Sequence, residues 1–417
     1  MLFVQGLNKL IKQEKAETAK PAECTKTIEP KVKECEECSN AGQKQPKLFT
    51  PGPLLTTKTV KRSMNYDYGS RDPQFIKVVK DIRNDILSIC EVQKGEYECV
   101  LIQGSGTYGI EAALTTAIPK TNHKLLIIAN GAYGIRQQKI AQYNNINYIT
   151  IDYDDNQVVV PEDVAKKLQE NPDVTHVSMI HSETTSGLIN PIEEVAKVVK
   201  AFNQNIIFLV DAMSSFGAYR INPKEAGIDY VVASSNKNLQ GIPGFSFAVV
   251  KTDVLLATKG NARSLVLDLY DQWQGLESNG QFRFTPPTHV LKATKVAIDE
   301  YLALGGLPAR FKRYNNNQKL LVQKMTELGF KLYIDQAYQG CIITTFLTPT
   351  HPSFKFEDMY NFLASKGLVI YPGKLTKADS FRIGSIGEIY EQDILTLVNT
   401  IQEYLGSKGV SIPVTYN

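Results

Sequence analysis

The sequence predicts an α/β protein with a mostly parallel central sheet and flanking helices, followed by a smaller C-terminal α+β domain. From Glu98 to Val250, short apolar runs of strand length alternate with amphipathic segments, which is typical of parallel strands joined by crossover helices. A second alternation of helix and strand follows Gly305 and Gly306, two glycines that can end a helix. The length of 417 residues exceeds one ordinary core, so two domains are expected.

The predicted elements follow one another in a regular order along the chain. The first is a helix over Ile76–Ile89, where apolar residues recur at helical spacing. The strands expected in the large domain are Cys99–Gln103, Leu125–Ala129, Tyr148–Ile151, Val174–His181, Ile206–Val210, Tyr230–Ala233 and Phe245–Val250. A long helix from Pro287 to Leu304 then leads into the small domain. The helices and strands expected there are Leu320–Leu328, Leu332–Ile334, Cys341–Phe346, Phe356–Lys366, Leu368–Tyr371, Phe381–Ile383 and Ile394–Leu405.

Two of the expected strands each end in one ionisable side chain. Asp211 follows Ile206–Val210, and Lys237 follows Tyr230–Ala233 in a loop of small polar residues and glycines. Ligands of an open α/β sheet bind outside the carboxyl ends of its strands. A lysine amine at that edge can form a Schiff base with pyridoxal 5'-phosphate, and a carboxylate can hold a proton on its pyridine nitrogen. A strand-end lysine is more often a solvated loop residue, and an aspartate is often a helix cap, so the spacing alone leaves both interpretations open.

A glycine-rich loop upstream has the properties of a phosphate-binding loop. Gly104–Gly109 follows the expected strand Cys99–Gln103 and precedes a helix that begins near Glu111. Glycines let the backbone approach an anion, and the N–H groups of the helix N-terminus attract it; Ser105, Gly106 and Thr107 are the candidate contacts. The same string fits a dinucleotide-binding oxidoreductase, but no acidic residue lies between Glu111 and Asp152 to bind ribose hydroxyls.

Taken together, these stretches resemble the class V, fold-type I family of pyridoxal-phosphate aminotransferases. The matching segments lie in collinear order across residues 47–408: LFTPGPLLTT (48–57), QGSGTYGIEA (103–112), ANGAYGIRQ (129–137), HSETTSGLINP (181–191), VDAMSSFGA (210–218), SSNKNLQGIPGFSF (234–247), NGQFRFTPPTH (279–289) and FRIGSIGEI (381–389). The lysine loop and FRFTPPTH resemble the branch that acts on 2-aminoethylphosphonate. The alanine–glyoxylate branch usually has glutamine where this chain has Asn236.

The resemblance implies a set of roles for residues of this chain. Lys237 and Asp211 are the catalytic candidates, and the segment Thr50–Pro53 is expected to reach over the active site. Thr285, with Arg283 as a second candidate, is expected to cross a homodimer interface to the neighbour's cofactor phosphate, so that the active sites are shared. Tyr133 is expected to stack on the cofactor ring, and Thr185 to lie near its phenolic oxygen. The full set of expected cofactor contacts is Ser105, Gly106, Thr107, Tyr133, Thr185, Asp211, Asn236, Lys237 and Thr285; no metal is expected.

Arg382 is the candidate for substrate binding. A transaminase holds the anionic group of its amino donor and its 2-oxo acid in the same pose, and a guanidinium fork binds such groups with two parallel hydrogen bonds. The resemblance implies transfer of the amino group of 2-aminoethylphosphonate to pyruvate by a ping-pong mechanism, giving phosphonoacetaldehyde and L-alanine in phosphonate catabolism. A sister activity, alanine or serine with glyoxylate or pyruvate, is the main alternative. The segment Met64–Pro73 departs from the family pattern, which leaves the role of Ser70 and Arg71 open.

The expected domain limits are residues 1–46 for a disordered N-terminal extension, 47–300 for the large cofactor-binding domain, 301–410 for the small domain and 411–417 for a tail. The extension is rich in Lys and Glu and cannot bury enough surface to order itself. Residues 1–20 contain no Arg but include Glu14 and Glu17, which favours a solvated tail and a cytoplasmic location over an organellar targeting peptide.

Composition disfavours several other classes of protein. A net charge of +3 from 46 basic and 43 acidic residues, scattered along the chain, argues against a nucleic-acid surface. No apolar run approaches the roughly 18 residues of a membrane span. The CEEC string at 35–38 lacks the second ligand pair of a zinc site. The three isolated cysteines, Cys90, Cys99 and Cys341, are expected to be reduced, buried thiols. A non-catalytic scaffold with this fold is disfavoured because Lys237, Asp211 and Arg382 occur together.

Overall fold

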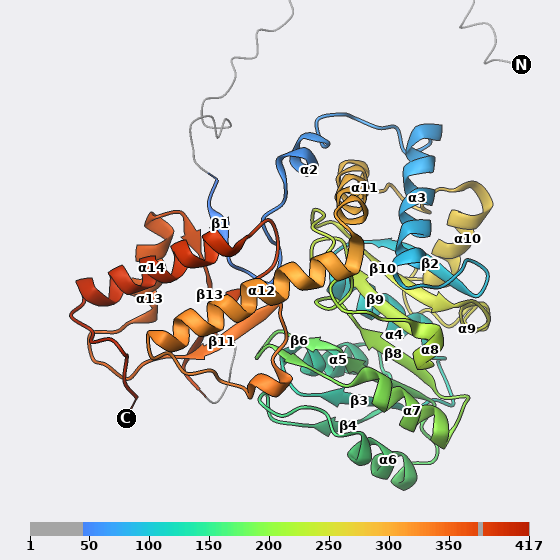
Figure 1. Ribbon diagram of the computed structural model, residues 1–417. Helices are drawn as coiled ribbons and strands as arrows, with labels where there is room; N and C mark the ends of the chain where they lie inside the picture. The colour runs from blue at the N-terminus through green and yellow to red at the C-terminus, as the bar shows by residue number, and fades with distance from the viewer. Residues whose placement is uncertain (1–44, 374–377, 417) are drawn as a thin grey trace, which may run out of the picture. The chain divides into compact units, whose positions relative to one another are not determined.

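The computed structural model describes residues 45–373 and 378–416, and its centre is a seven-stranded sheet with the order β2-β10-β9-β8-β5-β3-β4 (Figure 1). The strands are β2 (Tyr97–Gln103), β3 (Leu125–Ala129), β4 (Tyr148–Asp152), β5 (His176–Ile180), β8 (Ile207–Asp211), β9 (Tyr230–Ser234) and β10 (Phe245–Lys251). Strand β10 is antiparallel to both of its neighbours, and the other neighbouring pairs are parallel. Because only the loop 235–244 separates β9 from β10, no crossover helix fits between them, so β10 returns antiparallel. The predicted mostly parallel sheet is confirmed.

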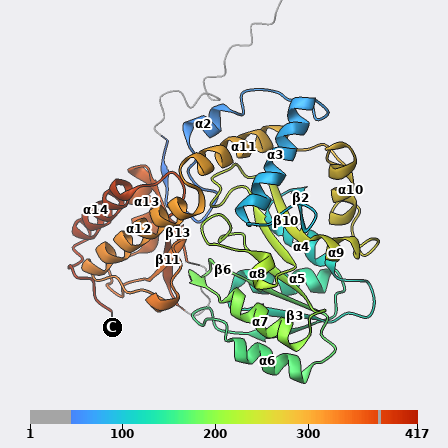
Figure 2. The same ribbon diagram turned by 45° about the vertical axis from the view of Figure 1, so that its right-hand side comes forward.

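Helices cover both faces and one edge of this sheet (Figures 1 and 2). Helix α4 packs on β9 and β10, α5 packs on β3, and α3 and α10 pack on β2. Helix α3 begins directly after Asp72, whose carboxylate accepts a hydrogen bond from Gln74 N, and Pro73 occupies its first position, as expected of a helix start. The helices of this part are α2 (Lys58–Arg62), α3 (Pro73–Ile89), α4 (Gly106–Ala117), α5 (Ala132–Tyr143), α6 (Pro161–Glu170), α7 (Ile192–Phe202), α8 (Pro223–Ala226), α9 (Thr252–Leu256), α10 (Leu269–Asn279) and α11 (Thr288–Ala303).

The C-terminal part is built on a three-stranded antiparallel sheet with the order β11-β14-β13, which confirms the predicted smaller α+β domain. Its core contains a cluster of aromatic rings; Phe381 lies 5.6 Å from Phe330 and 5.8 Å from Phe346 between ring centroids. Helix α12 runs from the end of α11 across to this sheet (Figure 1). The elements of this part are α12 (Gly306–Glu327), the 3₁₀ helix η1 (Gln336–Tyr338), β11 (Ile343–Leu347), α13 (Phe356–Ser365), β12 (Leu368–Val369), β13 (Tyr371–Pro372), β14 (Ser380–Gly384) and α14 (Glu391–Ser407).

The structure differs from the predicted elements mainly in the C-terminal part. Helix α12 begins at Gly306, although a helix was expected only from Leu320. The polar run Asn315–Asn317 interrupts the apolar periodicity, so the sequence did not indicate that the helix begins before it. Residues 332–334, expected as a strand, form a single bridge from Leu332 to Phe346. The expected strand Leu368–Tyr371 is divided into β12 and β13.

Two short pairs of strands lie outside the two main sheets, and one of them joins segments that are distant in sequence. Strand β1 (Lys47–Leu48) pairs in parallel with β12, and β6 (Ser182–Glu183) forms a hairpin with β7 (Leu188–Ile189). The described residues form one compact unit, and a boundary near residue 300 stays a prediction. The CEEC string and nearly all of the expected extension 1–46 lie outside the described residues. In the part of the chain that the structure describes, no helix is long and apolar enough to cross a membrane.

Candidate active site

A pocket lies at the carboxyl ends of β8 and β9 and contains about 760 Å³ of space, part of it open to solvent. It brings together residues from five separate stretches of the sequence. Seven of the predicted cofactor contacts line it: Ser105, Gly106, Thr107, Tyr133, Asp211, Asn236 and Lys237. Most of the candidate residues therefore lie in one cavity, and this cavity is at the carboxyl ends of the strands, where a ligand site was predicted.

One wall of the pocket is an open helix N-terminus. The chain turns at Gly104, whose φ of +109° favours glycine, and α4 begins at Gly106. Ser105 is the N-cap, but its side chain makes no capping hydrogen bond in the described structure. A Cβ atom on Gly106 would overlap with Met213 Sδ, so a side chain at this position would require Met213 to move. The first N–H groups of α4 can therefore bind an anion such as a phosphate.

Lys237 lies under the segment Thr50–Pro53, as the resemblance implied. Its Nζ donates hydrogen bonds to Pro51 O at 3.0 Å and to Gly52 O at 3.1 Å. Gly52 has a φ of +112°, and a Cβ atom there would lie 2.5 Å from Lys237 Cδ. Thr50 Oγ1 donates to Pro53 O at 2.6 Å, which holds the turn. The two carbonyl oxygens orient the amine in the pocket.

Asp211 is a buried carboxyl group at the end of β8. Its Oδ1 accepts a hydrogen bond from Met213 N at 3.0 Å. The pKa of Asp211 is raised to about 7, mainly because the group is buried; the nearby Glu183 also raises it, whereas the Met213 N–H, Arg136 and Lys237 lower it. A buried carboxyl group of this kind fits a ligand that brings its own positive charge, as a protonated pyridine nitrogen does. Together with the uncapped α4 and the Lys237 amine, the residues fit pyridoxal 5'-phosphate.

The raised pKa of Asp211 predicts a pH dependence of stability in the cofactor-free protein. The folded state holds this proton up to about pH 7, whereas the usual value for aspartate is 3.8. Between these values the folded state binds more protons than the unfolded chain, so through this group the free energy of unfolding falls as pH rises from about 4 to about 7. We expect Asp211→Asn to gain stability relative to wild type at pH 8 compared with pH 4.5, measured by urea denaturation. A wild-type-to-variant difference that is constant with pH would contradict this.

Thr185 lies beside the pocket rather than in its lining. Its hydroxyl accepts a hydrogen bond from Ala132 N at 2.9 Å and donates to Glu183 Oε1 at 2.6 Å. These contacts cap the start of α5, where Gly131 has no side chain to do so. The preceding residue, Thr184, lines the pocket instead. Adjacent threonines look alike in sequence, so the pattern could not distinguish their directions.

Thr285 and Arg283 both lie away from the pocket lining. Thr285 is exposed, and its carbonyl oxygen accepts a hydrogen bond from Gln103 Nε2. Arg283 Nη1 donates to Leu265 O at 2.9 Å, and its Nη2 lies 3.4 Å from Asp271 Oδ2. Within one subunit, neither residue reaches the cofactor pocket, so a role for Thr285 across a dimer interface stays a prediction.

Arg382 is buried in the middle of β14, where a strand was expected over Phe381–Ile383. Its Nε donates to Pro372 O at 3.0 Å, and its Nη1 donates to Thr184 O at 2.7 Å. Burial lowers the pKa of Arg382. Among the described residues no carboxylate hydrogen-bonds or ion-pairs with this guanidinium. The bond to Thr184 places it next to the pocket wall, where an anionic substrate group can pair with it.

The sequence reasoning missed several residues that line the pocket. Arg136 is the most informative, because its Nη1 donates to Thr107 Oγ1 at 3.0 Å and its guanidinium lies 4.8 Å from the centre of the Tyr133 ring. Its position three residues after Tyr133 on α5 was the available signal, since residues at that spacing share a helix face. The other missed lining residues include Thr184, Ser182, Met213, Ser214 and Ser234.

The chain is similar to several known aminotransferases. The family model described as aminotransferase class-V matches residues 59–383. The 2-aminoethylphosphonate–pyruvate transaminase of Bacillus cereus is 47% identical over 366 residues, which cover 88% of this chain and 98% of that protein. The structure of ureidoglycine–glyoxylate aminotransferase from Bacillus subtilis matches with a TM-score of 0.80 at 22% identity, over 88% of this chain and 95% of that chain. Pyridoxamine–pyruvate aminotransferase from Mesorhizobium loti matches with a TM-score of 0.80 at 23% identity, over 89% and 95%.

The two structural matches confirm the predicted fold-type I architecture. The family match and the close relative confirm the predicted reaction class and its cofactor, pyridoxal 5'-phosphate. The chain belongs to the class V family of pyridoxal-phosphate aminotransferases.

Proposed function

We propose that this protein transfers the amino group of 2-aminoethylphosphonate to pyruvate, giving phosphonoacetaldehyde and L-alanine in two half-reactions. The observation that carries the proposal is the pocket in which Lys237, Asp211 and the open N-terminus of α4 meet. The name of the Bacillus cereus relative, whose match covers 88% of this chain, supports the choice of substrates. A cytoplasmic location is part of the same proposal.

Each named residue has a distinct task in this proposal. When bound, pyridoxal phosphate supplies an aldehyde that captures the donor amine and a ring that accepts electrons. Lys237 Nζ removes the proton from the amine-bearing carbon of the donor, as a positioned general base. Asp211 keeps negative charge at the floor of the pocket and thereby stabilises positive charge on a bound ring. The N–H groups at the start of α4, with Thr107, bind phosphate.

Arg382 has to serve two different anions in the two half-reactions. The phosphonate of the donor is tetrahedral and the carboxylate of pyruvate is planar, but both present two oxygens to a guanidinium fork. One buried arginine whose hydrogen-bond partners are backbone carbonyls suits this alternation, because no resident carboxylate of the described structure competes for it.

The substrate assignment is tested by a panel of amino donors with pyruvate held constant and alanine formation as the readout. We expect 2-aminoethylphosphonate to give the highest kcat/KM. Faster turnover of serine than of 2-aminoethylphosphonate would overturn the substrate assignment in favour of the serine-type sister activity. The fold, the cofactor and Lys237 would be unaffected by that outcome.

We also propose that the protein is a homodimer in which Thr285 reaches the neighbour's site. Apolar side chains are exposed around this residue: Leu265 at 71%, Val266 at 58% and Phe284 at 40%. The bond from Arg283 to Leu265 O holds the two loops together, so these side chains can form one patch. Exposed patches of this kind typically bind another protein surface.

We expect sedimentation at working concentration to give a dimer, and Val266→Glu to shift it toward an inactive monomer. The charged side chain would be desolvated in the interface, which is unfavourable unless it is paired. Fully active wild-type monomer would exclude a shared site. The exposed Leu304 at the other end of α11 offers a matched control, and Leu304→Glu should leave the dimer intact.

A further inference from the structure

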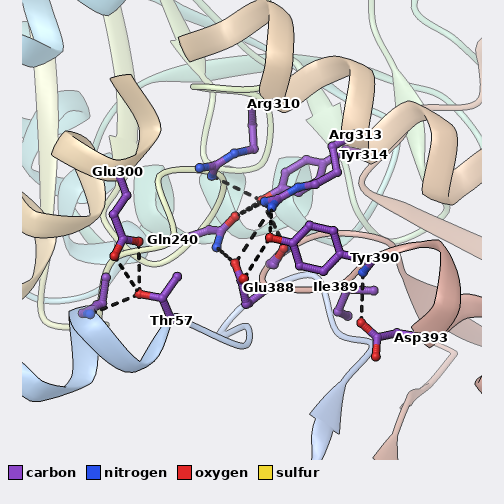
Figure 3. Close-up of polar contacts among 12 residues, drawn as sticks. Thr57, Gln240, Glu300, Arg310, Arg313, Tyr314, Glu388, Ile389, Tyr390 and Asp393 are labelled. Carbon is purple, nitrogen blue, oxygen red and sulfur yellow. Dashed lines mark hydrogen bonds and ion pairs between the residues drawn. The ribbon is translucent and has the colours of Figure 1, made fainter. Parts of the chain in front are cut away.

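The side chain of Gln240 joins the lysine loop to two other segments. Gln240 lies three residues after Lys237, is buried, and donates its backbone N–H to Lys237 O at 2.8 Å. Its Oε1 accepts hydrogen bonds from Tyr314 OH at 3.0 Å and from Arg313 Nη2. Its Nε2 donates to Glu388 Oε2 at 3.3 Å (Figure 3). The amide is therefore bonded at both ends, to α12 and to the loop before α14.

The same α12 side chains also bind the backbone of both segments. Arg313 Nη2 donates to Gly387 O at 3.2 Å, and Tyr314 OH accepts a hydrogen bond from Gly387 N at 3.1 Å. On the other side, Arg310 Nη1 donates to the carbonyl oxygen of Asn238, the residue after Lys237. The Arg313 guanidinium also lies between two tyrosine rings, 5.3 Å from the centre of Tyr314 and 5.0 Å from that of Tyr390 (Figure 3).

The loop held in this way continues directly from the strand that carries Arg382. Asn317, one turn further along α12, donates to Ser385 O at 3.2 Å and to Ile389 O at 2.9 Å. The loop also bonds the segment that covers Lys237, because Gly384 N donates to Phe49 O at 2.9 Å and Glu388 N donates to Leu55 O at 2.8 Å. The lysine loop, the segment that covers Lys237 and the loop that follows the strand of Arg382 are therefore joined by one set of hydrogen bonds.

A polar connection of this kind is chemically different from ordinary packing. Apolar contacts between the segments would contribute comparable stability, but they are non-directional and tolerate sliding. Buried hydrogen bonds and a guanidinium fork require one relative position, and leaving any of them unpaired costs free energy. The network therefore fixes the positions of the joined segments relative to one another.

We propose that Gln240, Arg313, Tyr314 and Glu388 are positioning residues that set the span between the Lys237 amine and the Arg382 guanidinium, and so select donors by the distance between their amine and their anionic group. The inference rests on the proposed function. In the described structure none of the four side chains lines the cofactor pocket, so their influence has to pass through the segments that they hold.

The test compares two donors that differ by one methylene, 2-aminoethylphosphonate and 3-aminopropylphosphonate, with pyruvate held constant. Gln240→Asn is the first variant, because asparagine tolerates the left-handed φ of +58° at this position but is too short to bridge both partners. Arg313→Met is the second, since it keeps the aliphatic stem and removes the fork. Arg220→Met is the matched control, an exposed arginine paired with Glu91 and Glu225.

We expect wild type to prefer the shorter donor in kcat/KM, and both variants to reduce that preference by about fivefold or more, because misplacement by about 1 Å can cost on the order of 100-fold in rate. Visible absorption of the bound cofactor should stay near the wild-type value, and the control should keep the wild-type preference. Hydrogen exchange at the amides of residues 385–388 should become faster in both variants.

The two proposals fail in distinguishable ways. If wild type uses neither aminophosphonate, the proposed function is wrong. If wild type prefers the shorter donor and both variants lose rate equally on the two donors, the cluster only stabilises the fold and the positioning role is wrong.

Discussion

Lys237→Ala is expected to lower kcat by about 10⁴-fold or more, the upper end of what a positioned proton-transfer group contributes. In the structure the Nζ atom is oriented by Pro51 O and Gly52 O within the pocket, and no neighbouring lysine lines this cavity in the described residues. The variant should still bind the cofactor through the start of α4, because that anion site does not include Lys237. Cofactor retention is measured by equilibrium dialysis and turnover by alanine formation.

Borohydride reduction of the cofactor-loaded wild type, followed by peptide mapping, identifies the attached lysine. The label should lie on the peptide that contains Lys237. Lys251 provides a matched control, since it lies at the end of strand β10 but is exposed and paired with Asp253, so Lys251→Ala should retain full activity. Label on another lysine, or normal turnover in Lys237→Ala, would refute the assignment.

Arg382→Gln is expected to lower kcat/KM by about 100- to 1,000-fold for both the phosphonate donor and pyruvate, because removing one partner of a buried charge pair costs roughly 2–5 kcal/mol. Glutamine can still donate to Thr184 O or Pro372 O, so the protein should fold. The loss should come mainly from KM, and it should affect both half-reactions because one guanidinium serves both anions. Single-turnover kinetics with each substrate separates the two effects.

Arg263→Gln is the control for Arg382→Gln. Arg263 also donates to backbone carbonyls, at 2.8 Å to Ile118 O and 3.0 Å to Pro119 O, but it lies outside the pocket lining. The Arg263→Gln variant should therefore have the wild-type kcat/KM for both substrates. A loss confined to pyruvate in Arg382→Gln would mean that a different cation, with Arg136 as the first candidate, binds the phosphonate.

Much of this protein could be predicted from its sequence, because the strands of the large domain are apolar runs that end in small polar residues. The expected strand Leu125–Ala129 agrees with β3, and the strand ends correctly placed Asp211 and Lys237 at one edge. The antiparallel return of β10 was not foreseen, although the short loop 235–244 allows nothing else.

The parts that escaped prediction are those that depend on tertiary contacts. The first turns of α12 contain Arg310, Arg313, Tyr314 and Asn317, which are polar or amphipathic and break the apolar periodicity. Their helical conformation is stabilised by partners in loops more than 60 residues away in sequence, such as Asn238 and Ser385. No local pattern contains that information, and for the same reason the pattern could not choose between Thr184 and Thr185.

The segment that covers Lys237 has a consequence for how the enzyme matures. Strand β1, immediately before it, pairs with β12. Phe49 O and Leu55 O accept hydrogen bonds from Gly384 N at the end of β14 and from Glu388 N in the loop after it, so the partners of this segment are among the last parts of the chain to be synthesised. Contacts of such long sequence separation form late in folding, and chains fold progressively as they leave the ribosome. A nascent chain that ends before β12 can build the central sheet but not the cover over its amine. We therefore expect the cofactor to reach its final orientation only after the chain is complete, and ribosome-bound chains truncated near residue 360 should bind pyridoxal phosphate less tightly than the released protein.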